Sequence, residues 1–259
     1  MKKFLVLVNI ALILLAGCSS TVSNIEPTPA PPEYIDEEFL IDLEKAILNR
    51  IEMGNENASY LSVVNAEYTF VSKYTDKDLQ WENDDLRNLA WNYVSGLEIQ
   101  KKAVEDTELQ YNNFWIEWYD GALKRYNVIV DLYQNYGAFT ENAQIIENNY
   151  VSSLSALEKT YNGLNEVGKD LASQFDGVHL NYDSRESAVV LSVKNNTEYT
   201  YDVTFFFHVF DNEGVRIGDA SSYFTMVKPG SNNNFKIYIN LSDFDEGTYE
   251  LNWELNIYY

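Results

Sequence analysis

The chain has 259 residues and a formal net charge of −22, and 46% of its residues are hydrophobic. This composition is typical of a folded protein with one large domain or two ordinary ones. A strong negative charge repels nucleic-acid phosphates, so we expect no nucleic-acid partner. The single cysteine, Cys18, excludes an intrachain disulfide and a thiolate metal cluster.

Residues 1–17 have the three parts of a secretory signal peptide. Lys2 and Lys3 are followed by an apolar run from Phe4, and the segment ends in Leu15-Ala16-Gly17 before Cys18. These last four residues resemble the lipobox of bacterial lipoproteins. The resemblance implies that Leu15, Ala16 and Gly17 are recognised by the signal peptidase and that the Cys18 thiol carries the lipid.

Two alternatives remain for this leader. One is a plain signal peptide with a coincidental cysteine. The other is an uncleaved membrane helix, but the stretch from Phe4 to Gly17 would span only about 21 Å of a ~30 Å hydrocarbon core.

Residues 18–33 contain four prolines and predict an extended tether, in which residues 19–33 reach roughly 45 Å. We therefore expect a protein held on the extracytoplasmic face of the cell membrane by its lipid. An outer membrane is the alternative if the host has two membranes.

Residues 34–175 show helical spacing of apolar side chains and predict an all-α bundle of four or five helices. Asp36 is the expected N-cap of the first helix, which extends to Met53. A second helix follows over 59–73. The stretch 84–136 is either one long helix or two with a joint at 105–108, and the last helix covers 140–175.

An aromatic cluster stands out in this bundle, formed by Tyr111, Trp115, Trp118 and Tyr119. Apolar residues on two faces of a helix favour a position in the centre of the bundle. If the rings are exposed instead, they could stack on a glycan or contact a partner. Burial of the tryptophans decides between the two interpretations.

In residues 176–259 the apolar period changes to two, and six strands are expected with turn residues between them. Strands at this spacing predict a small β-sandwich. The fold class is therefore multidomain, with an all-α bundle followed by an all-β domain.

Phe207-His208-Val209-Phe210-Asp211 followed by Gly214 is similar to the FxLYD-type domain, with Val for Leu and Phe for Tyr. The resemblance implies an immunoglobulin-like sandwich of a kind found on bacterial surface lipoproteins, with no established activity. Independently of the family, Asp211 is expected to accept hydrogen bonds from turn N–H groups, and Gly214 to adopt a positive φ.

The sequence offers little catalytic chemistry. The two histidines, His179 and His208, fit strand positions, and the carboxylate pair Glu117 and Asp120 fits a solvated helix face. The oxygen-rich turn from Asp243 to Gly247 could be a calcium site but is explained by a hairpin. No motif for a cofactor or metal is present.

We therefore expect a non-enzymatic lipoprotein that contacts an unknown envelope protein or ligand. The alternative is a module that binds cell-wall glycan or a small solute through the bundle aromatics.

Overall fold

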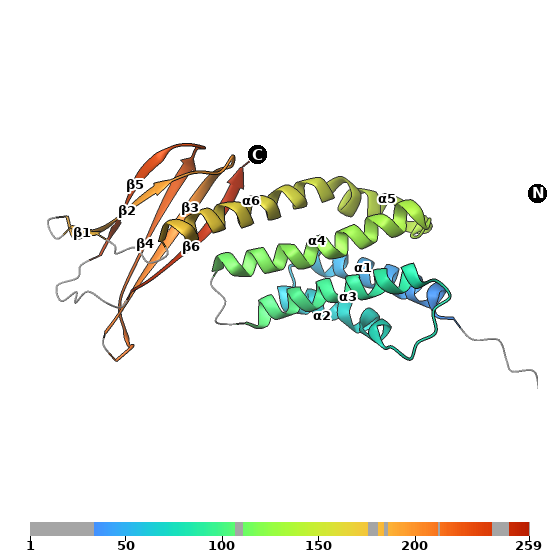
Figure 1. The fold of residues 1–259 in the computed structure, drawn as a ribbon. Helices are drawn as coiled ribbons and strands as arrows, with labels where there is room; N and C mark the ends of the chain where they lie inside the picture. Colours follow the sequence, from blue (N-terminus) through green and yellow to red (C-terminus); the bar gives the residue numbers. More distant parts are fainter. Residues whose placement is uncertain are drawn as a thin grey trace, which may run out of the picture. The chain divides into compact units, whose positions relative to one another are not determined.

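Helices fill the first part of the computed structural model, and antiparallel strands fill the second (Figure 1). The structure describes residues 34–106, 111–175, 181–183, 186–211, 213–239 and 249–258. From Tyr34 onward the chain forms one compact unit. The predicted order of a helical region followed by antiparallel sheets is confirmed.

Long helices occupy the region that the sequence predicts to be helical. They are α1 (Asp36–Asn55), α2 (Tyr60–Val71), α3 (Asp84–Glu105), α4 (Tyr111–Asn135) and α6 (Ser152–Phe175). The question over residues 84–136 is thereby answered, because α3 and α4 are separate helices. Among the described residues, none of the helices combines the length and apolarity that crossing a membrane requires.

The expected N-cap role of Asp36 is wrong. The N-cap position of α1 is Ile35, which provides no side-chain hydrogen bond. The Asp36 carboxylate instead accepts the backbone N–H groups of Glu82 and Asn83, both at 2.9 Å. Two donors from a distant loop thus occupy the carboxylate, and the loop before α3 is tied to the start of α1.

The last predicted helix, 140–175, is interrupted. A 3₁₀ turn (Thr140–Asn142) leads into the short α5 (Ala143–Ile146), and a π-helical turn (Glu147–Val151) precedes α6. A π turn inserts one residue and so rotates the following helical face by about 100°. The residues before it face the helical core, and the second half of α6 faces a different core.

The closest helix pair is α3 and α4, which meet at two glycines. A Cβ atom placed on Gly96 would lie 2.7 Å from the carbonyl oxygen of Gly121. Glycine at both positions therefore lets the two backbones touch. The polar side chains one turn farther along, Gln100 and Arg125, are brought within 3.2 Å of each other.

The strands form two three-stranded antiparallel sheets. Their ranges are β1 (Asn181–Asp183), β2 (Ala188–Lys194), β3 (Thr200–Phe210), β4 (Arg216–Val227), β5 (Asn232–Tyr238) and β6 (Tyr249–Tyr258). One sheet has the order β1-β2-β5 and the other the order β4-β3-β6. We call the second one sheet B.

Both sheets contribute side chains to a single hydrophobic core. Alternate residues of β3 point into it, as the period of two predicts: Tyr201, Val203, Phe205, Phe207 and Val209. Leu164, Val167 and Leu171 of α6 lie in the same core. Helix α6 therefore joins the helical region to the sheets: its start packs against the helical core, and its second half lies in the core of the sheets.

Candidate functional site

The predicted lipidation site lies outside the described residues. This holds for Cys18 and for the expected signal-peptidase residues Leu15, Ala16 and Gly17. The lipid anchor therefore stays a prediction from the sequence.

The predicted aromatic cluster sits at the start of α4, where the helical region meets the sheets. Tyr111 is the first residue of α4, but its side chain is not described. Trp118 is only 9% exposed and belongs to the helical core. Trp115 and Tyr119 are partly buried and pack against both hydrophobic cores. The cluster therefore serves largely as packing between the two parts of the fold.

An exposed aromatic residue, Tyr60 of α2, lies beside this cluster and was not among the residues expected from the sequence. Its ring lies 4.8 Å from that of Trp118 and 6.0 Å from that of Trp115, and its residue is 49% exposed. Its position next to the N-cap Ser59 is a local signal for exposure, since first-turn residues have few helical neighbours. Only the tertiary structure shows that Tyr60 lies beside α4.

Beneath the aromatic cluster lies a buried ionic network. The Arg50 guanidinium stands 5.7 Å above the Trp118 ring and donates to the Glu67 carboxylate at 2.5 Å. Glu67, on α2, is completely buried. Its other oxygen accepts hydrogen bonds from the Arg125 guanidinium and the Tyr93 hydroxyl. Side chains from α1, α2, α3 and α4 thus meet at one carboxylate.

The network holds Glu67 in its ionised form. Burial raises the pKa of this carboxyl, but the charges of Arg125 and Arg50 outweigh burial and leave the pKa below its usual range. Burial and the Glu67 charge raise the pKa of Tyr93 well above its usual value. A paired, ionised carboxylate and a neutral phenol give a stable hydrogen-bonded anchor. This arrangement makes no proton available near neutral pH.

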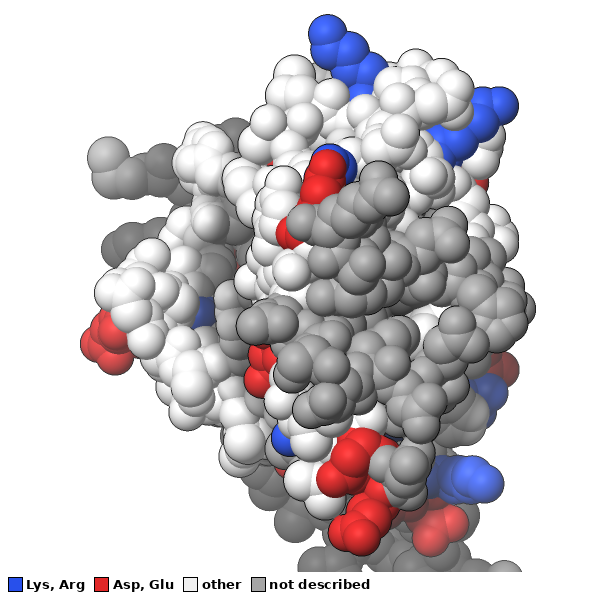
Figure 2. All heavy atoms as spheres, turned by 90° about the vertical axis from the view of Figure 1, so that its left-hand side faces the viewer, with Lys and Arg blue, Asp and Glu red and all other residues white. Residues whose placement is uncertain are grey.

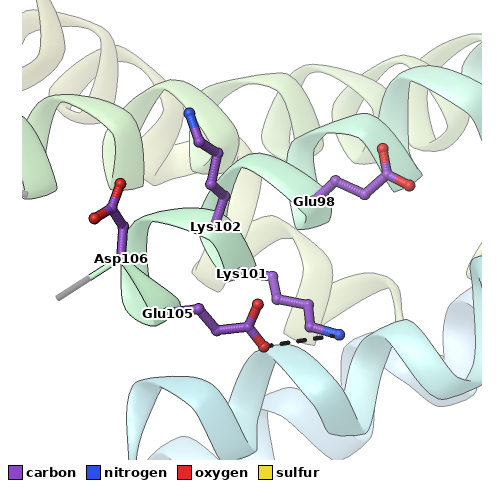
Figure 3. A pocket seen from close by; sticks show the side chains of 5 residues that line it. All are labelled: Glu98, Lys101, Lys102, Glu105 and Asp106. Atoms are coloured by element: carbon purple, nitrogen blue, oxygen red, sulfur yellow. Dashed lines mark ion pairs between the residues drawn. The ribbon is translucent and has the colours of Figure 1, made fainter. Parts of the chain in front are cut away.

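Two hollows mark the surface of α3. The first has a volume of about 360 Å³, is widely open to solvent, and is lined by Glu98, Lys101, Lys102, Glu105 and Asp106 (Figure 3). In it the Lys101 ammonium faces the Glu105 carboxylate at 3.9 Å. The second, at the other end of α3, measures about 510 Å³ and has several acidic residues at its rim. Within the described ranges, no three metal-ligating side chains gather in a group.

The structure describes three of the remaining candidates for chemistry, namely Glu117, Asp120 and His208. Glu117 and Asp120 are half-buried on α4, and Asp120 accepts a hydrogen bond from Tyr161 of α6. His208 lies on sheet B with its Nδ1 atom 2.9 Å from the Asp219 carboxylate. His179 and the turn from Asp243 to Gly247 lie outside the described residues.

The turn after β3 has the predicted geometry. The Asp211 carboxylate accepts the backbone N–H groups of Glu213 and Val215, each at 2.9 Å. Gly214 has a φ of +78°. Both expectations for this turn are confirmed, and both duties of these residues are structural.

The chain matches no protein-family model, no curated protein and no solved structure.

Proposed function

We propose that this protein is a lipid-anchored extracytoplasmic lipoprotein that acts as a non-enzymatic interaction module. The proposal starts from the sequence of the leader, in which small residues precede Cys18, and from the proline-rich segment 18–33. The lipid on Cys18 then attaches the protein to the membrane, and the folded part contacts an envelope protein or ligand.

The observation that carries the interaction role is where the sheets lie in the unit that begins at Tyr34. Helix α1 begins at the end of the helices that is far from the sheets (Figure 1). The 20 residues of α1 span about 30 Å. A chain anchored before Tyr34 would therefore present its sheets at the end away from the attachment point.

We further propose that the sheets form an immunoglobulin-like sandwich of the FxLYD type. Support comes from the single core that the two sheets share and from the Asp211 turn. In the view of Figure 2, most described atoms belong to uncharged residues, and lysines and arginines are scattered rather than gathered. This distribution favours contact with a protein over contact with nucleic acid.

Metabolic labelling with a radioactive fatty acid tests the anchor. The full chain should incorporate the label, and Cys18→Ser should not. Protease added to protoplasts with an intact membrane should digest the folded part. A soluble, unlabelled wild-type product would contradict the proposal. Affinity capture from the solubilised envelope then tests the interaction role, with the Cys18→Ser chain as the matched control for lipid-dependent recovery.

A second function, binding of cell-wall glycan or a small solute, is favoured by the exposed Tyr60 ring above Trp118. Aromatic rings of this kind stack on sugar faces. Co-sedimentation with purified peptidoglycan would be weakened by Tyr60→Ala and unchanged by Tyr238→Ala, an exposed tyrosine on β5. Equal sedimentation of both variants with wild type would end this alternative.

A further inference from the structure

A nearly buried carboxylate on sheet B is held by neutral groups alone. Asp202 of β3 is 4% exposed, although it points to the side of the sheet away from the hydrophobic core. Its Oδ2 atom accepts the hydroxyl groups of Tyr223 and Tyr258, each at 2.6 Å. Its Oδ1 atom accepts the backbone N–H of Met226 at 2.8 Å. We call these four residues the Asp202 cluster.

The charge of Asp202 has no partner of opposite sign among the described residues. Burial raises its pKa, but the hydrogen bonds from Tyr223, Tyr258 and Met226 outweigh burial, so the carboxyl stays ionised. Among the described residues the other buried carboxylate belongs to Glu67, which contacts two arginines. Removing a carboxylate from water without a counter-charge is costly. Asp202 therefore favours the approach of a cation.

The side chains around this charge are exposed and suited to an organic cation. Tyr223 and Tyr258 are 61% and 40% exposed, and Met226 is 54% exposed. The tyrosines come from β4 and β6, the two neighbours of β3, so their rings lie on either side of Asp202. A phenol that donates to an anion has a more electron-rich ring, which attracts a cation more strongly. The hydrogen bond to Asp202 also raises the pKa of Tyr223 to about 12, so this hydroxyl remains a neutral donor.

The backbone at Met226 supports the same interpretation. Met226 has a φ of +55°, which non-glycine residues rarely adopt. The strain coincides with a register shift between β3 and β4 beside Asp202. It is the N–H of this strained residue that reaches the carboxylate. Strained residues concentrate at binding sites.

We propose that the Asp202 cluster is a binding site for an alkylammonium group, supplied by a lysine side chain of an extracytoplasmic protein partner. That the ammonium group comes from a protein partner rests on the proposed interaction role. The alkylammonium site itself does not rest on that role. The ammonium lies against the tyrosine rings with the Asp202 charge behind them, and the Met226 thioether covers the methylene chain.

Nuclear magnetic resonance of methyl-labelled methionine tests the site on the full chain. The sequence has three methionines, of which Met226 lies in the cluster and Met53 in α1. Titration with n-butylammonium chloride should shift the Met226 methyl signal saturably in the millimolar range and leave Met53 unchanged. Sodium chloride controls for ionic strength, and n-pentanol is the neutral isostere.

Variants then assign the effect to the cluster. Tyr223→Leu removes one exposed ring and should weaken binding by about two- to fivefold, as expected for one exposed cation–ring contact. Tyr238→Leu, which removes a 65% exposed tyrosine on the other sheet, should leave binding unchanged. Asp202→Asn keeps the shape of the side chain and should weaken binding further. If Asp202→Asn fails to fold, Tyr223→Leu and Tyr258→Leu carry the test.

Three results would overturn the site: no saturable shift, an equal shift with n-pentanol, or unchanged binding by Tyr223→Leu. A final comparison addresses the source of the ammonium. Tighter binding of a lysine-containing peptide than of choline supports a protein partner. Tighter binding of choline would overturn that source. Failure of fatty-acid labelling would refute the anchor and leave this titration unaffected.

Discussion

Replacing Glu67 by glutamine tests the importance of the buried ionic network. The substitution keeps the size of the side chain but leaves the Arg125 guanidinium, which is completely buried, without its counter-charge. Removing one partner of a buried ion pair costs about 3–5 kcal/mol. For a unit of this size, that loss corresponds to a thermal unfolding midpoint lower by roughly 6–20 °C.

Urea denaturation followed by circular dichroism measures the free energy of unfolding. Glu186→Gln is the matched control, because Glu186 pairs with Lys236 at the surface, where both side chains are more than 40% exposed. We expect a change within about 0.5 kcal/mol for this control. The double variant Glu67→Met/Arg125→Met should be more stable than Glu67→Gln alone, because no unpaired buried charge remains at Arg125.

The pH dependence has a definite sign. The folded-state pKa of Glu67 lies below its unfolded value of 4.5. The ionised network therefore contributes its full stability above the unfolded pKa, and the contribution is lost as pH falls through the folded pKa. Glu67→Gln should remove part of the acid sensitivity below pH 4.5. Equal urea midpoints for Glu67→Gln and Glu186→Gln would refute the reasoning.

Five further substitutions, in two matched pairs and one single change, test the helices and the turn. Gly96→Ala should destabilise the protein, because the new Cβ would lie 2.7 Å from a backbone oxygen of α4. Gly54→Ala has nothing within 4 Å of the new Cβ and should stabilise α1 by up to about 1 kcal/mol. Thermal melts in which both variants change stability in the same direction would contradict this pair of predictions. Asp211→Ala should cost about 1–2 kcal/mol, since two turn N–H groups lose their acceptor, and urea titration measures it. Trp118→Ala should lower the free energy of unfolding by about 3–5 kcal/mol, because Trp118 is only 9% exposed. Trp91→Ala should lower it clearly less, because Trp91 is 37% exposed. A similar loss for both variants would show that Trp118 is not part of the core.

Local signals in the sequence were enough to place most of the elements. The change of period from 3.6 to 2 after residue 175 separates helices from strands, and the described strands all follow that residue. Asp211 and Gly214 were correctly assigned because a turn is decided by residues next to each other in the chain.

Contacts between distant segments required the tertiary structure. Asp36 has the residue type of an N-cap, but its hydrogen bonds go to residues more than 40 positions away. The π turn before α6 has no sequence signature of its own, and the sequence does not show that Leu171, near the end of α6, lies in the core of the sheets. Whether Trp118 is core or surface depends on Tyr60 and Arg50, which come from other helices.

The buried carboxylates of Glu67 and Asp202 show the same division between local and tertiary information. The sequence by itself determines that the chain has forty acidic residues, most of which must lie in water. It cannot determine that Glu67 meets two arginines while Asp202 meets only neutral donors. Periodicity reports which side of an element a residue occupies, and the partner on that side is fixed only when helices and strands pack against one another.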